Sequence, residues 1–120
     1  VSDHLPEDEE SKRLPFAQAA TGAIGVETLL PLALEMYHNE SLPLNKIIEL
    51  LTINPAKILQ IKKGSLSKGS DGDICIFDLE APWVVKTEEL KSKSKNTAIE
   101  GRKLQGKVLM TFLNGELVFN

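Results

Sequence analysis

The sequence predicts an α/β chain with helices in its first half and strands in its second. Apolar residues recur three and four apart within 26–37 and again within 44–51, which is the spacing of one helix face. An apolar run at 74–77 and an Asn114-Gly115 pair between two apolar segments are strand and hairpin patterns. A closed (β/α)8 barrel needs about 250 residues. With 120 residues, we expect one modest core that belongs to a larger unit.

The helices are expected after a long loop over 1–24, where neither a period of 2 nor one of 3.6 is present. The first helix should cover about 27–39, with Pro31 tolerated in its first turn, where backbone donors lack intrahelical acceptors; a kink is the alternative. A second short helix follows Leu42-Pro43. A third should cover about 55–60, with Asn54 as its cap and proline at its first position.

The strands follow a glycine-rich link. We expect a buried strand over 73–79, a second brief strand at 83–85, and a polar, lysine-rich surface segment over 87–102. The last element is a hairpin at 107–119, because Asn-Gly adopts the positive φ angles of a tight two-residue turn most readily.

Composition excludes several classes of protein. The formal charge is −3 with acids and lysines interspersed, which argues against a nucleic-acid groove. Cys75 has no partner for a disulfide or thiolate cluster, which suits a reducing cytoplasm. No apolar stretch approaches the roughly 20 residues that span a bilayer, and the first residues are acidic rather than signal-like. We therefore expect a soluble, cytoplasmic protein.

Candidate chemistry begins at Asp3-His4, a short turn of the kind that ends a barrel strand at a metal site. Read alone, an aspartate in such a position more often solvates a loop or caps a turn than binds a metal. His4 and His38 are the only histidines and no His-x-His pair occurs, so the other ligands are missing. The chain is therefore expected to be the last third of a larger enzyme. The lysines of loop 92–97 either bind an anion or belong to an ordinary basic surface.

A series of motifs resembles the carboxy-terminal part of dihydroorotases, in the class associated with aspartate transcarbamoylase. In chain order the pieces are S-D-H-L-P (2–6), P-F-A (15–17), G-A-I-G-V-E-T-L-L-P-L (22–32), L-T-I-N-P-A (51–56), G-S-L-S-K-G-S-D-G-D-I-C-I-F-D (64–78), W-V-V (83–85), S-K-S-K-N-T (92–97) and G-K-V-L-M-T (106–111). The most specific are the G-x-x-G-x-E-T helix start and S-K-S-K-N-T. The glycine-rich link also occurs in hydantoinases and allantoinases.

The resemblance implies a zinc-dependent enzyme that interconverts dihydroorotate and N-carbamoyl-aspartate in pyrimidine biosynthesis. Asp3 would be the carboxylate after the eighth barrel strand, which binds the metal and moves a proton between water and the amide nitrogen. Its oxygen is a suitable zinc ligand, although the zinc would not be held by this chain alone. Thr21 and Gly22 match the loop whose backbone touches the substrate ring.

One position departs from the family pattern. Where dihydroorotases commonly have D-H-x-P-H, with the histidine on the substrate carboxylate, this chain has Glu7, whose charge would repel that group. Lys12 or Arg13 is a candidate to supply the cation instead. The departure also raises an alternative, a dihydroorotase-like subunit without activity that assembles aspartate transcarbamoylase.

The resemblance also implies a division of the chain. Residues 1–62 would be the end of the barrel, from the strand 8 loop through the last helices, and 63–120 part of a small composite β domain. The remainder of the barrel would then be a partner of this segment. A hypothesis from another class is a free-standing binding module with a helical half and a β half.

Overall fold

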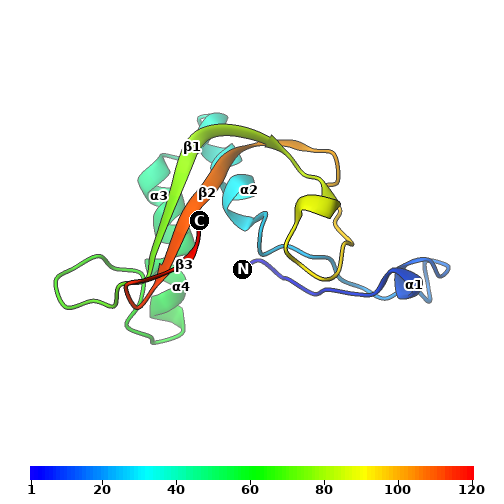
Figure 1. Cartoon of the computed structure of the whole chain (residues 1–120), viewed down its shortest axis with the longest axis horizontal. Helices are drawn as coiled ribbons and strands as arrows, with labels where there is room; N and C mark the ends of the chain where they lie inside the picture. The colour runs from blue at the N-terminus through cyan, green and yellow to red at the C-terminus, as the bar shows by residue number, and fades with distance from the viewer.

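The computed structural model describes all 120 residues and confirms the α/β composition (Figure 1). The elements are, in chain order, α1 (Glu9–Lys12), α2 (Leu29–His38), α3 (Leu44–Leu51), α4 (Ile53–Ile58), β1 (Ile74–Val84), the 3-10 helix η1 (Thr87–Glu89), β2 (Lys103–Leu113) and β3 (Glu116–Phe119). None of the helices is both long and apolar enough to cross a membrane.

Helices α2 and α3 agree closely with the periodic segments. Helix α2 begins at Leu29, so Pro31 lies within its first turn, as predicted. The start of α4 differs from the prediction. It lies at Ile53, and Thr52 rather than Asn54 occupies the cap position. Helix α3 ends at Leu51 and α4 begins at Ile53, so there is no loop between them in which Asn54 could act as a cap. The Thr52 hydroxyl between the two helices donates to the Ile48 carbonyl of α3 at 2.6 Å.

Helix α1 lies inside the segment that was predicted to be a loop. The Asp8 carboxylate accepts a hydrogen bond from the Ser11 backbone N–H at 2.8 Å, and Glu9 and Glu10 occupy the first turn. Acidic side chains are favourable there because the N-terminal end of a helix carries partial positive charge. A single turn is too short to produce hydrophobic periodicity, which explains why the pattern missed it.

The three strands form one antiparallel sheet in the order β1-β2-β3. The hairpin between β2 and β3 is confirmed. Asn114 and Gly115 both have positive φ, at 52° and 83°, as a two-residue hairpin turn requires. Strand β2 begins at Lys103, four residues earlier than predicted, because its first part pairs with the end of β1.

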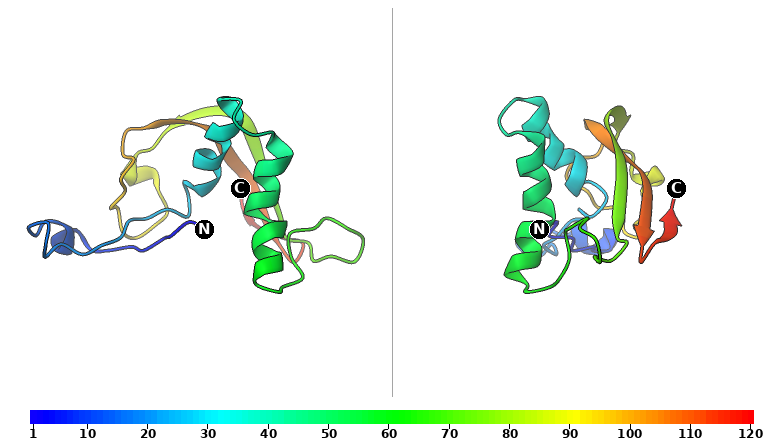
Figure 2. Two further views of the ribbon diagram at one scale, coloured as in Figure 1. Left: turned by 180° about the vertical axis from the view of Figure 1, so that it is seen from behind. Right: turned by 90° about the vertical axis from the view of Figure 1, so that its left-hand side faces the viewer.

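The two strands expected at 73–79 and 83–85 are a single strand, β1, with irregular pairing between Asp78 and Pro82. The prediction that the first of them is buried was wrong. Alternate residues in the second part of β1 are half-buried, whereas Ile74 and Ile76 in its first part are 39% and 43% exposed. The reason is that helices α2 to α4 lie on one side of the sheet only, so no helix covers the opposite face of β1 (Figure 2).

Helices α2 to α4 lie on one side of the sheet (Figure 2). Helix α2 crosses β2 so closely that a Cβ added to Gly106 would lie 2.4 Å from Leu34 Cδ1. The main apolar cluster joins the loop before α2 to β2 and to the residues that follow β1 and η1, and its members are Ile24, Val85, Leu90 and Leu104. This packing crosses residue 62, and the division of the chain at that point remains a prediction.

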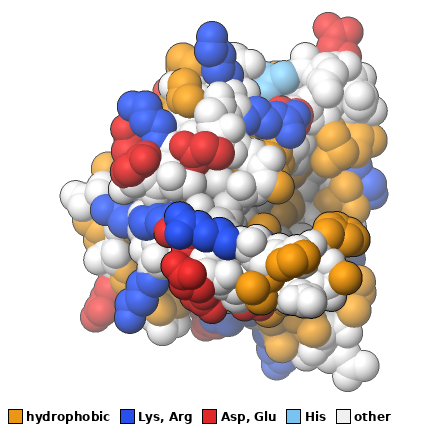
Figure 3. Space-filling view, turned by 90° about the vertical axis from the view of Figure 1, so that its right-hand side faces the viewer, with side chains coloured by type: hydrophobic (Ala, Val, Ile, Leu, Met, Phe, Trp, Pro, Cys, Tyr) orange, Lys and Arg blue, Asp and Glu red, His pale blue; other side chains and the backbone are white.

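The core is small for the length of the chain. Only 10 of 120 residues are buried, and the accessible surface is 8787 Å², whereas a compact protein of this mass exposes about 6,400 Å². The radius of gyration is 16.2 Å, against about 13.6 Å for a compact domain of this length. Apolar side chains also lie among the charged ones at the end that bears α1 (Figure 3). Such exposure does not favour a free-standing module.

Candidate functional site

The Asp-His turn and the glycine loop lie side by side, although about twenty residues separate them in the sequence. His4 and Ala23 form an isolated parallel bridge, and the Leu5 N–H donates to the Ala23 carbonyl at 3.0 Å. The structure therefore brings together Asp3 and the Thr21-Gly22 loop, the two features that the sequence assigned to one site.

Asp3 has a backbone φ of 49°, a left-handed conformation that is uncommon for a residue other than glycine. The residue is exposed, and nowhere in the 120 residues do three His, Cys, Asp or Glu side chains gather as metal ligands. A single exposed carboxylate fits one ligand position of a zinc ion, because carboxylate oxygens are among the side-chain groups that zinc accepts.

His4 has a structural role in this turn. Its Nδ1 accepts hydrogen bonds from the backbone N–H groups of Gly25 at 3.0 Å and Val26 at 3.3 Å. An Nδ1 that accepts places the proton of the neutral ring on Nε2. The imidazole thus ties the Asp3 turn to the residues just before α2.

Gly22 packs closely against Leu5 and also accepts two side-chain hydrogen bonds through its carbonyl. Its φ is 131°, and a Cβ would lie 2.6 Å from the Leu5 carbonyl oxygen, so this close approach requires glycine. Its own carbonyl accepts from Lys12 Nζ and from Asn96 Nδ2, each at 3.0 Å. Thr21, immediately before it, is exposed.

The two cations suggested as partners of a substrate carboxylate have other partners. Lys12 Nζ donates to the Ala20 carbonyl at 2.7 Å as well as to Gly22. Arg13 pairs with Glu9 and Glu10 on the exposed side of α1. The arrangement favours a loop-holding role for Lys12 and a surface role for Arg13.

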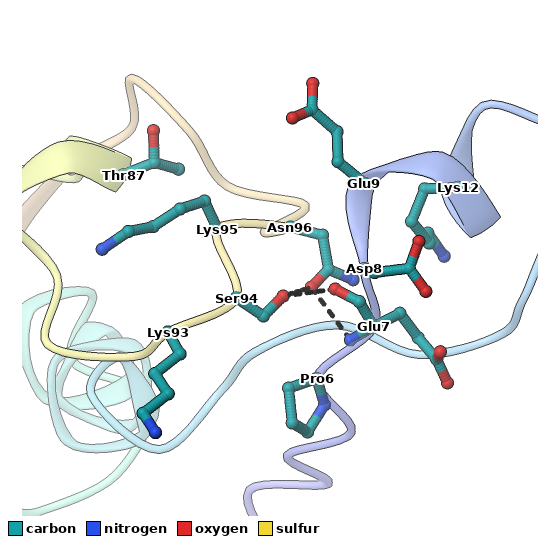
Figure 4. Close-up of a pocket in the computed structure, with 10 residues that line it drawn as sticks. All are labelled: Pro6, Glu7, Asp8, Glu9, Lys12, Thr87, Lys93, Ser94, Lys95 and Asn96. Carbon is teal, nitrogen blue, oxygen red and sulfur yellow. Dashed lines mark hydrogen bonds between the residues drawn. The ribbon is translucent and has the colours of Figure 1, made fainter.

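Glu7 lines an open cavity between the α1 segment and the loop after η1 (Figure 4). Its side chain extends away from Lys93 and Lys95, which lie on the opposite side of the cavity (Figure 4). Lys95 donates to the Leu90 carbonyl at 2.7 Å, whereas Lys93 forms no hydrogen bond or ion pair. The remaining lining residues are Pro6, Asp8, Glu9, Lys12, Thr87, Ser94 and Asn96.

Asn96 and Ser94 are contributors that reasoning from the residues missed. The Glu7 N–H donates to Asn96 Oδ1 at 3.4 Å, and the Ser94 hydroxyl lies within hydrogen-bond distance of the Glu7 carbonyl and of that same Oδ1. The S-K-S-K-N-T motif did draw attention to this loop. Its lysines were weighed as anion ligands, whereas its asparagine and serine bind the backbone of the site.

Comparison with known proteins gives the class to which this chain belongs. The model of the amidohydrolase family matches residues 3–118, and the chain belongs to that family. Among curated proteins it is similar to the dihydroorotases of Anaplasma phagocytophilum and Aquifex aeolicus, with 43% and 42% identity over 119 residues. The resemblance inferred from the motifs is thereby confirmed. The match covers 99% of this chain but 27% and 28% of those two proteins, so the chain spans about a quarter of their length.

Solved structures of related hydrolases share the fold. An L-hydantoinase (dihydropyrimidinase) from Arthrobacter aurescens superposes with a TM-score of 0.79 at 32% identity, over 87% of this chain and 24% of the hydantoinase. A dihydropyrimidinase from Brevibacillus agri gives a TM-score of 0.92 over 98% of this chain and 27% of its own, at 23% identity. The second likeness bears on the fold alone.

Proposed function

We propose that the full-length protein carrying these residues is a zinc-dependent dihydroorotase of cytoplasmic pyrimidine biosynthesis, which interconverts dihydroorotate and N-carbamoyl-aspartate. The observation that carries this proposal is the identity of 37–43% to dihydroorotases over nearly the whole chain. The solved hydantoinase and dihydropyrimidinase described above reach 32% and 23%. A hydantoinase-like or allantoinase-like activity is therefore the weaker reading.

In this proposal, residues 1–62 form the end of a (β/α)8 barrel and 63–120 form part of an accessory β domain. The active sites of such barrels lie at the carboxyl ends of the strands. Asp3 would follow the last strand, and the other metal ligands would come from outside these 120 residues. The parallel bridge between His4 and Ala23 supports this view, because it aligns the Asp3 turn with the neighbouring loop.

Asp3 is proposed to bind the metal and to act as the proton carrier. When bound, zinc supplies Lewis acidity at the amide carbonyl and lowers the pKa of water. Ring opening forms a bond from a water oxygen to the carbonyl carbon and breaks the carbon–nitrogen bond. The Asp3 carboxylate takes the proton from water and delivers it to the departing nitrogen; ring closure reverses these transfers.

The substrate ring would lie against the backbone of Thr21 and Gly22. Glu7 does not suit the substrate carboxylate, since like charges repel. Its side chain is on the α1 side of the cavity, and the unpaired Lys93 on the other side supplies an opposite charge (Figure 4). We therefore propose that the departure at Glu7 is compatible with activity.

Substrate comparison tests the proposal. Purified full-length protein, loaded with zinc, should open dihydroorotate and close carbamoyl aspartate, with kcat/KM for dihydroorotate at least tenfold above that for hydantoin. A preference for hydantoin would overturn the assignment in favour of the hydantoinase-like reading.

Glu7 also motivates a second candidate function, an inactive scaffold for aspartate transcarbamoylase. This role predicts no turnover of either substrate together with co-purification of the transcarbamoylase. Turnover of dihydroorotate would exclude the inactive scaffold.

A further inference from the structure

Asn96 connects the two segments that form the candidate site. Its Nδ2 donates to the Gly22 carbonyl at 3.0 Å, and its Oδ1 accepts from the Glu7 N–H at 3.4 Å. Its backbone carbonyl accepts from the Ile24 N–H at 3.0 Å. One residue therefore contacts the Asp3–Glu7 segment and the Thr21–Ile24 loop from a position more than seventy residues further along the chain. Figure 4 shows its contact with Glu7.

The geometry of the amide makes this contact directional. An asparagine side chain is planar, with donors at one end and an acceptor at the other, and here both ends are used. Lys12 also reaches the Gly22 carbonyl, but an ammonium on a flexible stem acts as a point charge and constrains orientation less. Asn96 is also half-buried, so water replaces its contacts less readily than at the surface.

Fixing the Gly22 carbonyl fixes the whole peptide plane between Gly22 and Ala23, because the peptide bond is planar. The same asparagine holds Glu7, two residues beyond Leu5, whose carbonyl Gly22 touches. Asn96 thus adds a second link between the Asp3–Glu7 segment and the glycine loop, beside the direct hydrogen bond from the Leu5 N–H to the Ala23 carbonyl.

We propose that Asn96 is a positioning residue that sets substrate affinity by orienting the Gly22 peptide. The inference rests on the proposed function, in which the Thr21-Gly22 backbone contacts the substrate ring. The effect on substrate affinity comes from the donor end of the amide, which binds the Gly22 carbonyl. The acceptor end binds the Glu7 N–H and so holds the Asp3–Glu7 segment.

The test compares Asn96→Asp with the unmodified full-length enzyme in steady-state dihydroorotate hydrolysis. Aspartate keeps an acceptor for Glu7 and replaces the donor to Gly22 with a charged oxygen that faces a carbonyl. We expect KM to rise at least tenfold, which is about 1.4 kcal/mol, while kcat changes less than threefold and the bound metal content is unchanged. A rise in KM at constant kcat marks lost binding energy that is common to the ground and transition states.

This split separates positioning from a loss of folded protein, which would lower the apparent kcat and leave KM unchanged. Ser94→Ala removes a hydroxyl from the acceptor end of the amide and from the Glu7 carbonyl but leaves the donor to Gly22 in place, so it should raise KM less than threefold. Asn39→Ala, at an exposed asparagine at the end of α2, should have no effect. An unchanged KM in Asn96→Asp, or a fall in kcat alone, would overturn the inference while leaving the proposed function in place. Absence of turnover by the unmodified enzyme would contradict the proposed function itself, and the inference with it.

Discussion

Gly22 is a residue of the site at which both the backbone conformation and the close packing require glycine. Its positive φ and its contact with the Leu5 carbonyl, 2.6 Å from an added Cβ, act together. A strained φ of this kind costs of order 1–3 kcal/mol, and the backbone contact adds to that cost. We predict that Gly22→Ala lowers the free energy of unfolding of the full-length protein by at least this amount and lowers kcat/KM, as measured by denaturant titration and assay.

Gly69→Ala is the matched control. Gly69 also has a positive φ, of 89°, but an added Cβ would meet nothing within 4 Å. It should therefore cost only the strain and leave kcat/KM unchanged. Equal destabilisation by the two substitutions would show that the contact with Leu5 contributes nothing.

At the level of elements, Asp73 connects the start of β1 to the turn between β2 and β3. Its carboxylate accepts from the Asn114 N–H at 2.9 Å and pairs with Lys63. The Asn114 hydrogen bond first, and Lys63 second, lower the pKa of Asp73 below its ordinary 3.8. A pKa lowered by folding stabilises the folded state above that ordinary value, and the contribution is lost as the pH falls through the lowered pKa.

We therefore predict that Asp73→Asn lowers the melting temperature at pH 7, and that the difference from the unmodified protein shrinks as the pH falls below about 4. Thermal melts across this range check it. Asp71→Asn is the control, because Asp71 also contacts Lys63, at 2.7 Å, but receives no backbone N–H from the hairpin. A difference that stays constant or grows on acidification would contradict the argument.

The elements differ in how far the sequence could predict them. Helix α3 and the Asn114-Gly115 turn follow from local rules, namely apolar periodicity and positive φ, and were predicted correctly. The continuity of β1 through Pro82 could not be predicted, because it depends on pairing with β2 twenty residues later. Exposure of β1 was missed for a related reason: an apolar run shows that a strand can be covered, without showing which segment covers it.

The same distinction applies to the site. Asp3 and Gly22 were assigned to one site through the resemblance of their motifs, and the structure places their segments side by side. Asn96 lies in a polar loop whose composition is that of an ordinary surface segment. Its role depends on a contact across more than seventy residues, which no local pattern reveals.

At the level of the whole molecule, exposed apolar surface is the main property of these 120 residues. Phe16, Ile58 and Leu59 are 100%, 80% and 67% exposed. We predict that the isolated 120-residue polypeptide binds a hydrophobic dye such as ANS and self-associates, as monitored by fluorescence and light scattering. A cooperative monomeric melt without dye binding would instead favour the free-standing module.

The most direct test of the account is the rate of carbamoyl aspartate cyclisation by the full-length enzyme with Asp3→Ala. Loss of a group that transfers the proton costs about 10²–10⁴-fold in rate, and loss of a metal ligand adds to this. We predict a fall of at least 100-fold, whereas Glu10→Ala, an exposed carboxylate on α1, keeps the full rate. An unchanged rate in Asp3→Ala would contradict the central claim that Asp3 is the catalytic carboxylate.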